Sequence, residues 1–367
     1  MTTTNLLNEE IKGTACIITG GLLDTIHAKT THGLLRESKR FEIQGIIDAK
    51  FAGQNTSQFV GDTANSVEIF STIGALEEKL GHKPKYAIIG MATKGGVLPE
   101  SLYPIVLEAL SEGLHIVNGL HQPLSEIEEM QQMAVKNHAL IYDIRKPKKF
   151  DQLHFWKGKI REVNCLRVGI LGTDCSTGKR TTTRLLVNLL NQEGIKTEMI
   201  YTGQTGWMQG TKHGFIFDAT PNDFIPGEIE HAIVQCWEEE KPEITIVEGQ
   251  ASLLNPGGPC GSEFIISGKL DAVILQHHPI REKYNNLEHL PDIIPSPEID
   301  IKMMQMMGTE VLAITMNTKN MTEQQIKEHG SLLKDKTGLP VFDPLKGEIE
   351  ELANLLIAKS KQLKTRS

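Results

Sequence analysis

The segment 172–182 constrains this chain more than any other stretch. It reads GTDCSTGKRTT. It follows the apolar run 167–171 directly, and its last four residues begin the stretch 179–193, whose apolar side chains recur at helical spacing. Between a buried strand and a helix, such a loop points its N–H groups and those of the first helical turn at one spot, where the helix dipole adds positive potential. The segment therefore predicts a site for a phosphate-type anion.

Two positions of this segment depart from the pattern G-x-x-x-x-G-K-[ST]. Thr173 stands where the first glycine is expected, and Arg180 stands where a hydroxyl normally ligates Mg²⁺. An arginine adds donors for phosphate but does not coordinate a cation, so the pattern favours a diphosphate held without metal, with Thr181 or Asp174 as alternative metal ligands. The candidate anion-binding residues are Thr173, Asp174, Cys175, Ser176, Thr177, Gly178, Lys179, Arg180, Thr181 and Thr182.

Three further polar positions follow apolar runs or turn-rich segments of the same half. Because ligands of doubly wound sheets collect at the carboxyl ends of strands, Glu248 is a candidate general base or metal-organising carboxylate, the alternative being a solvated strand-end acid. His277 is a candidate acid/base or substrate ligand, although the pair with His278 is not expected to bind metal because adjacent side chains of an extended chain diverge. Asp223 precedes a predicted helix, where it either takes part in catalysis or only caps the N-terminus of that helix.

The chain is too long, at 367 residues, for one ordinary core, which favours two domains. The basic, proline-broken stretch 145–149 reads as a linker, so we predict domains at 1–150 and 151–367, both α/β with doubly wound parallel sheets. In the first, strands are expected at 14–18, 42–47, 86–89 and 139–144, and helices at 67–80, 101–112 and from a capping box at 125–128 to about 137. In the second, strands are expected at 167–171, 196–201, 244–247, 271–275 and 311–315, and helices at 179–193, 227–239, 297–307, 323–334 and from about 347.

The first half carries weaker functional signals. Gly20 and Gly21 after the first strand, with Asp48 after the second, imitate the layout of a dinucleotide site. The motif G-x-G-x-x-G is missing, so NAD binding is not the favoured interpretation. The loops 93–96 and 118–121 are either a substrate surface or plain turns.

Composition sets limits on location and ligand. No run of about 18 apolar residues exists to span a membrane, and the polar start of the chain lacks a secretory pattern. Five cysteines without a CxxC pair indicate reduced thiols rather than a disulfide framework. The net charge of −8, without a basic stretch interleaved with aromatics, does not support an extended nucleic-acid surface. We expect a cytoplasmic protein with a small-molecule ligand, no membrane partner, and homo-oligomers.

These motifs together resemble a known family. The segment 172–182, the pair Asp223-Phe224, the triplet Glu248-Gly249-Gln250 and the pair Gln276-His277 are similar to a bacterial and archaeal family long labelled domain of unknown function 1611. Its members combine an N-terminal Rossmann-like domain with a C-terminal P-loop domain related to dethiobiotin synthetase. One branch is described as D-glutamate N-acetyltransferase, which uses acetyl-CoA and often works beside an enolase-type epimerase or racemase.

The resemblance implies roles for the residues above. The loop would hold the phosphates of acetyl-CoA, for which Lys179 and Arg180 supply positive charge. Acetyl transfer needs a neutral amine, which implies a base among the catalytic candidates Glu248, His277 and Asp223, while Gln250 and Arg281 would bind the carboxylates of an acidic amino acid. Two alternatives stay open: an ATP- and Mg²⁺-dependent ligase or kinase of the dethiobiotin synthetase type, and a non-catalytic nucleotide-binding regulator.

Overall fold

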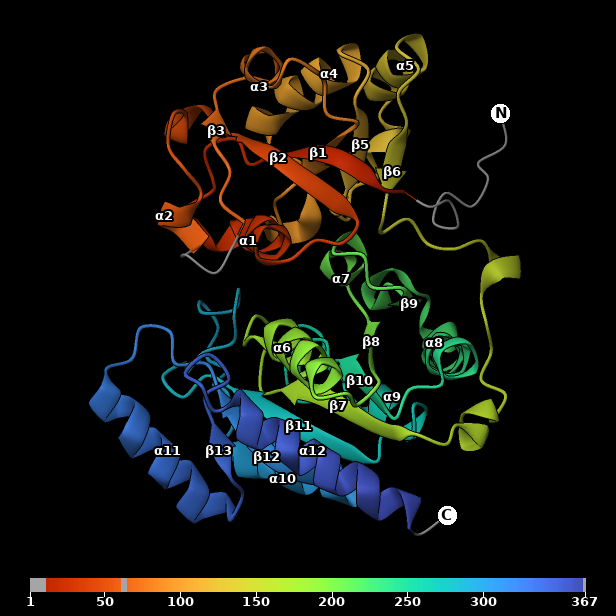
Figure 1. The fold of residues 1–367 in the computed structure, drawn as a ribbon, viewed down its shortest axis with the longest axis vertical. Helices are drawn as coiled ribbons and strands as arrows, with labels where there is room; N and C mark the ends of the chain where they lie inside the picture. Colours follow the sequence, from red (N-terminus) through yellow and green to blue (C-terminus); the bar gives the residue numbers. More distant parts are fainter. Residues whose placement is uncertain (1–10, 61–64, 366–367) are drawn as a thin grey trace. The chain divides into compact units, whose positions relative to one another are not determined.

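The computed structural model describes residues 11–60 and 65–365, so the polar start of the chain considered above lies outside the described residues. The chain forms two compact units (Figure 1). The first contains the residues up to Lys148 together with Gln204–Thr211, and the second contains Lys149–Gly203 together with the residues from Lys212 onward. Within the described ranges, no helix has the length and apolar character needed to cross a membrane.

The first unit is built on a six-stranded parallel sheet with the strand order β3-β2-β1-β4-β5-β6. This is the order of the Rossmann fold, so the predicted fold class is confirmed. In Figure 1 helices α3, α4 and α5 line one face of this sheet and α1 the other. The elements are β1 (Gly13–Ile18), α1 (Lys29–Arg36), β2 (Phe41–Ile47), α2 (Ser57–Val60), β3 (Ile69–Phe70), α3 (Ile73–Leu80), β4 (Tyr86–Ile89), α4 (Tyr103–Ser111), β5 (His115–Asn118), α5 (Glu128–Lys136) and β6 (Ile141–Asp143).

A short helix from the other half of the sequence completes this unit. It is α7 (Gln204–Met208), all of whose residues are buried. Arg40 stacks over the Trp207 ring at 4.2 Å and donates from Nε to the Trp207 carbonyl. The amide of Gln209 donates to the carbonyl of Gly33 at 2.9 Å. A buried amide and a stacked guanidinium fix this segment to α1 and to the start of β2.

Two predictions for the first unit are wrong. Residues 67–80 do not form one helix, because Ile69 and Phe70 pair with β2, and α3 begins only after Thr72, whose hydroxyl accepts a hydrogen bond from the N–H of Ala75. The capping box at 125–128 does not form either. The N–H of Ser125 donates to the Asp143 carboxylate, and α5 starts two residues later than predicted without a side-chain cap.

The second unit is built on a seven-stranded parallel sheet with the order β13-β12-β11-β7-β10-β8-β9. All five predicted strands and all five predicted helices are present, with ends that differ by up to three residues. The elements are β7 (Leu166–Gly172), α6 (Lys179–Gln192), β8 (Thr197–Tyr201), β9 (His213–Gly214), α8 (Ile225–Glu240), β10 (Ile244–Glu248), α9 (Ser262–Ile266), β11 (Ala272–His277), α10 (Pro297–Met306), β12 (Glu310–Met316), α11 (Glu323–Thr337), β13 (Val341–Phe342) and α12 (Ile349–Lys364).

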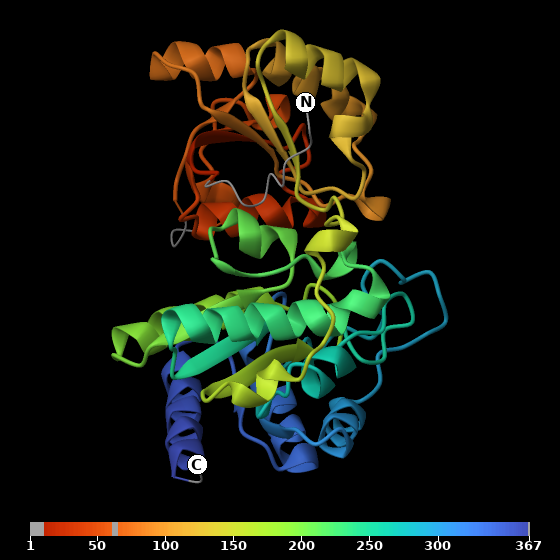
Figure 2. The same cartoon turned by 90° about the vertical axis from the view of Figure 1, so that its right-hand side faces the viewer.

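Helices cover both faces of this sheet. Along β7, Val168 and Ile170 pack in one core with side chains of α6 and α12, while Leu171 packs in the other with α8 and α9. Figure 2 shows α8 in front of the strands. Because β7 lies between β10 and β11, the loops that follow these three strands lie side by side at the carboxyl edge.

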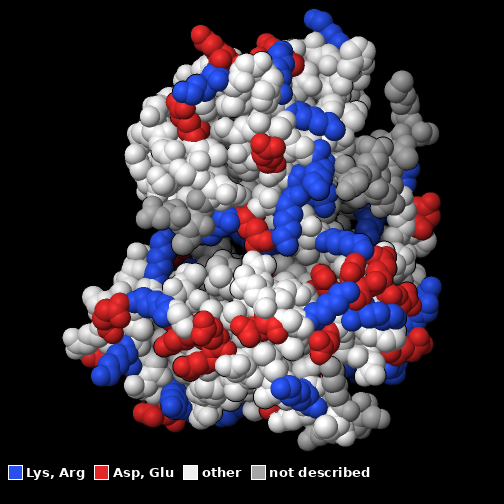
Figure 3. Space-filling view, in the orientation of Figure 1, with Lys and Arg blue, Asp and Glu red and all other residues white. Residues whose placement is uncertain are grey.

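Charged side chains of both signs are interspersed on the face of the second unit drawn in Figure 3. This matches the modest net charge of −8. A surface of mixed charge produces little long-range field of one sign. We therefore expect an anion to be recognised by local geometry, at the carboxyl edge described next.

Candidate functional site

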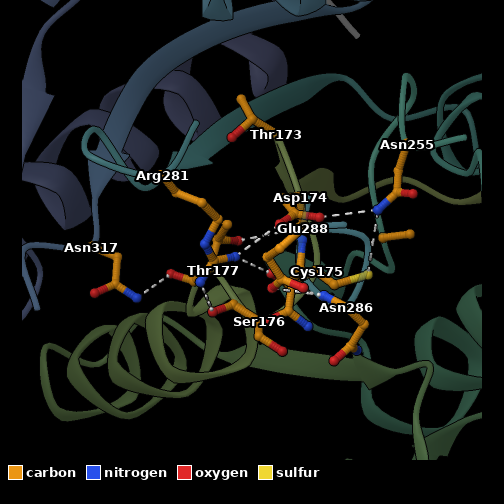
Figure 4. A network of polar contacts seen from close by, with 12 residues as sticks. Thr173, Asp174, Cys175, Ser176, Thr177, Asn255, Arg281, Asn286, Glu288 and Asn317 are labelled. Atoms are coloured by element: carbon orange, nitrogen blue, oxygen red, sulfur yellow. Dashed lines mark hydrogen bonds and ion pairs between the residues drawn. The ribbon is translucent and has the colours of Figure 1, made fainter. Parts of the chain in front are cut away.

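The loop after β7 has the backbone geometry that a phosphate site requires. Gly178, just before α6, has φ +113°, a conformation that side chains rarely adopt, and Ser176 has φ +53°. Thr173 and Thr177 are buried. The side-chain amide of Asn317, directly after β12, donates to the Thr177 carbonyl at 2.9 Å (Figure 4). The loop is thus held from a neighbouring strand while the first turn of α6 offers its N–H groups.

Lys179 is the buried cation of the loop. Its Nζ donates to the carbonyl of Asp174 at 2.7 Å and to that of Ala251 at 2.9 Å. Burial lowers the pKa of Lys179, and the neighbouring Cys175, Asp174, Cys260 and Glu248 counteract this effect. An ammonium group bonded to neutral carbonyls keeps its charge for an incoming anion, so Lys179 can exchange these oxygens for those of a phosphate.

Asp174 occupies the centre of a polar network in the same loop (Figure 4). Its carboxylate is fully buried and accepts hydrogen bonds from Arg281 Nη1 at 2.9 Å, from Asn255 Nδ2 at 3.0 Å and from the N–H of Asn285 at 2.8 Å. Arg281 also donates to the Cys175 carbonyl at 2.6 Å. Both carboxylate oxygens of Asp174 are therefore engaged with protein donors, which makes it a poor ligand for Mg²⁺ in this arrangement.

Glu248 lies at the carboxyl end of β10, beside β7. It is 5% exposed, and burial raises the pKa of its carboxyl group against the lowering effects of Arg180, Lys179 and Arg184. The hydroxyl of Thr202 donates to the Glu248 carbonyl at 2.7 Å and accepts from Gln250 Nε2 at 2.8 Å. A buried carboxylate with a raised pKa next to cations is a group that can accept a proton.

His277 ends β11 and is 7% exposed. Its Nδ1 lies 2.9 Å from the hydroxyl of Thr173, and burial lowers its pKa to about 4, so the ring is neutral at pH 7. The preceding Gln276 points to the other face, where its Oε1 accepts from Thr182 at 2.6 Å and from Thr315 at 2.8 Å. Two consecutive side chains of β11 thus anchor the start and the end of the phosphate loop.

The remaining predicted residues take different positions. Asp223 is exposed in the short turn Asn222–Phe224, and in the described part of the chain its carboxylate makes no hydrogen bond to the loop. It does not cap α8 either, because that helix begins without a side-chain cap. Thr181 is half-buried on α6. Arg281 and Gln250, predicted to bind substrate, contact Asp174 and Thr202, and their roles toward a substrate stay predictions.

Several residues of the network were missed from the sequence. Asn317 directly follows β12, so the rule applied to Glu248 and His277 could have found it. Asn255 lies in the glycine-rich stretch 255–261, which carries no phosphate-loop signature and has the composition of an ordinary surface turn. The structure nevertheless places Asn255, 4% exposed, against Asp174. Asn285 contributes only its N–H, which no side-chain pattern reveals.

One cluster in the described ranges has the composition of a metal site. His213 on β9 lies 3.9 Å from Glu239 and 3.7 Å from Glu240, at the end of α8. The Lys212 ammonium already bridges these two carboxylates at 2.9 and 2.6 Å. The Lys196 ammonium lies 3.6 Å from Glu240 as well, so two cations of the protein itself balance the two carboxylates of the cluster.

The fold and the loop together define a two-domain P-loop protein with a Rossmann-like partner domain. The family model of the DUF1611 P-loop domain, a domain of unknown function, matches residues 154–353, and that of the DUF1611 Rossmann-like domain matches residues 49–147. The chain therefore belongs to the DUF1611 family, as the motifs predicted.

Relatives of known sequence and structure agree with this assignment. A D-glutamate N-acetyltransferase of Pseudoalteromonas sp is 31% identical over 283 residues, which cover 76% of this chain and 82% of the relative. One from Tritonibacter scottomollicae is 29% identical, with coverage of 77% and 84%. A DUF1611 family protein from Anabaena variabilis, known as a crystal structure, superimposes with a TM-score of 0.85 at 29% identity, covering 95% of this chain and all of that one.

Proposed function

We propose that this protein transfers an acetyl group from acetyl-CoA to the amine of an acidic amino acid, with D-glutamate as the first substrate to test. The observation that carries the proposal is the composition of the phosphate loop. Lys179 and the start of α6 suit a diphosphate, Arg180 replaces the usual Mg²⁺-ligating hydroxyl, and both oxygens of Asp174 are engaged. The names of the two relatives support this choice of reaction and substrate.

The reaction assigns a task to the groups beside the loop. Acetyl-CoA supplies an acetyl group activated as a thioester. The amine nitrogen forms a bond to the thioester carbonyl carbon, the carbon–sulfur bond breaks, the amine loses a proton and the CoA thiolate gains one. Glu248 has the raised pKa of a carboxylate that accepts such a proton, and the neutral His277 is the second candidate. N–H groups of the loops would stabilise the oxygen of the reacting carbonyl.

The experiment measures CoA thiol release and acetylated product from acetyl-CoA with D-glutamate or L-glutamate, with Mg²⁺ and with chelator. We expect turnover that chelator leaves unchanged, and isothermal titration should show metal-independent binding of acetyl-CoA. Binding of ATP only with Mg²⁺, together with ADP release, would replace this proposal with the ligase alternative. Tight nucleotide binding without any turnover would indicate the regulator.

A further inference from the structure

The Asp174 carboxylate joins the phosphate loop to two other loops at the carboxyl edge. Asn255 belongs to the loop after β10, and Arg281 and the N–H of Asn285 belong to the loop after β11. These strands flank β7 on either side, with Glu248 opposite Ile170 in one pairing and Gln276 opposite Gly172 in the other. In Figure 4 the three segments converge on Asp174.

The three donors to the Asp174 carboxylate all come from outside the phosphate loop. A carboxylate in this loop repels a bound phosphate, so we expect its other interactions to offset this repulsion. The three donors provide these interactions, and a fully buried carboxylate with three hydrogen bonds, one of them from a guanidinium, is satisfied only while both flanking loops stay in place. The position of the phosphate loop and the positions of its neighbours therefore depend on one another.

Lys179 adds a second connection to the loop after β10. Its ammonium donates to the Ala251 carbonyl, three residues beyond Glu248. A phosphate that binds this ammonium changes the environment of Ala251. A displacement of the phosphate loop reaches Asn255 through the Asp174 carboxylate, and it reaches Arg281 through that carboxylate and through the Cys175 carbonyl. Phosphate binding thus acts on the loops after β10 and β11, which lie on either side of the phosphate loop. An acceptor next to a cofactor would lie between these loops.

We propose that Asp174 is a positioning residue that couples occupancy of the phosphate loop to the order of the loops after β10 and β11, so that cofactor binding forms the acceptor site. The inference rests on the proposed function in one respect, namely that the phosphate loop holds the cofactor. It implies that the cofactor binds first and raises acceptor affinity, by about tenfold for a coupling of ordinary size. Reciprocity requires the acceptor to raise cofactor affinity by the same factor.

Hydrogen–deuterium exchange of the full chain tests this without relying on turnover. Inorganic pyrophosphate and CoA are the probes, and peptides covering 250–261 and 281–288 report on the two loops. In the wild type both probes should slow exchange in these peptides and at 172–182. Asn255→Ala should lose the protection at 250–261 and keep it at 281–288, whereas Arg281→Met should do the reverse. Asp174→Asn should lose both, and Asp335→Asn on the exposed face of α11 should lose neither.

The outcomes separate this inference from the proposed function. The inference is overturned if both loops stay protected in Asp174→Asn. It is also overturned if 250–261 stays protected in Asn255→Ala and 281–288 stays protected in Arg281→Met, because the ligand then orders the loops without the network. If Asp174→Asn does not fold, the two single variants still decide. If the variants lose protection in the expected loops but the wild type transfers no acetyl group, the inference holds and the acetyltransferase proposal is rejected. If neither probe protects 172–182 in the wild type, both are rejected.

Where D-glutamate binds, its affinity with and without CoA gives a second measure. A residue with only a structural role would weaken both affinities and leave their ratio unchanged. We expect the ratio to fall from about ten to below about two in Asp174→Asn. An unchanged ratio would contradict the coupling.

Discussion

The carboxyl edges of the two sheets differ although both sheets are parallel and doubly wound. In the first unit the polar side chains at strand ends satisfy one another: Thr19 donates to Asp48 at 2.6 Å, and Asn118 donates to Asp143 at 2.7 Å. In the second unit the same edge carries a glycine loop, the buried Lys179 and a network that spans three loops. A shared topology thus provides a place for a site, and the loop sequence decides whether one is built there.

The largest expected effect tests the chemistry of the second edge. Glu248→Gln keeps the size of the side chain but removes its capacity to accept a proton. We expect kcat for acetyl transfer to fall by about 100-fold or more, as for loss of a general base, with Kd for acetyl-CoA within about threefold of wild type. Steady-state kinetics and titration measure the two quantities. Unchanged kcat would transfer the role to His277 or to solvent.

Removal of the buried cation tests what holds the phosphates. Lys179→Ala deletes the ammonium that we expect to exchange carbonyls for phosphate oxygens. CoA affinity should fall by about 30- to 100-fold, in line with about 2–3 kcal/mol for a charge-assisted hydrogen bond, while the exposed control Lys302→Ala binds normally. If Lys179→Ala and Lys302→Ala bind CoA with equal affinity, the carboxyl edge of the second unit does not hold the cofactor phosphates through Lys179.

The first edge should respond to mutation in stability rather than in binding. Asp48 is fully buried and also accepts from the N–H of Lys50 at 3.1 Å. Asp48→Ala leaves the Thr19 hydroxyl and this N–H without their acceptor, which should cost about 1–3 kcal/mol in urea unfolding. Affinity for CoA should stay at the wild-type value. A variant that folds normally but fails to bind CoA would place a ligand function in the first unit.

A smaller effect concerns pH. The folded-state pKa of His277, about 4, is below the ordinary histidine value of 6.5, so the unfolded chain binds a proton that the folded protein does not bind between these pH values. Stability from this group is present above pH 6.5 and is lost as pH falls toward 4. His277→Gln should flatten the urea-unfolding profile over this range. His115 in the first unit is shifted in the same direction, so an equally large flattening in His115→Gln would remove the contrast between the units.

The sequence was most informative where one physical signal dominates. Apolar runs predicted the strands of the second sheet, and the glycine loop with its lysine predicted the phosphate site, because both signals are local. Helix 67–80 failed because Ile69 and Phe70 satisfy helical and strand spacing equally well, and pairing with β2 decides between them. Helix α7 was missed because all of its residues are buried, so it lacks an amphipathic period.

The polar network was beyond local patterns for a different reason. Asp174, Asn255 and Arg281 are separated by about 30 to 110 residues and meet only because β10 and β11 flank β7. The sequence placed Asp174 in the phosphate loop and Arg281 near the site, but it did not contain the strand register that brings Arg281 and Asn255 to about 3 Å from the Asp174 carboxylate. Arg281 illustrates the limit: a cation near the site was expected to bind substrate, and its observed partner is a carboxylate of the protein.

Helix α7 belongs to the first unit but lies in the second half of the sequence, and this affects the order in which the units can fold during synthesis. During synthesis the first unit is interrupted after Lys148, and its remaining segment, Gln204–Thr211, emerges about 60 residues later. At roughly 5–20 residues per second the ribosome takes several seconds to deliver it. The bond from Gln209 to Gly33 can form only after β7, α6 and β8 have been translated. The two units therefore cannot mature strictly one after the other, and a nascent chain stopped near residue 150 would lack part of the packing of its first domain.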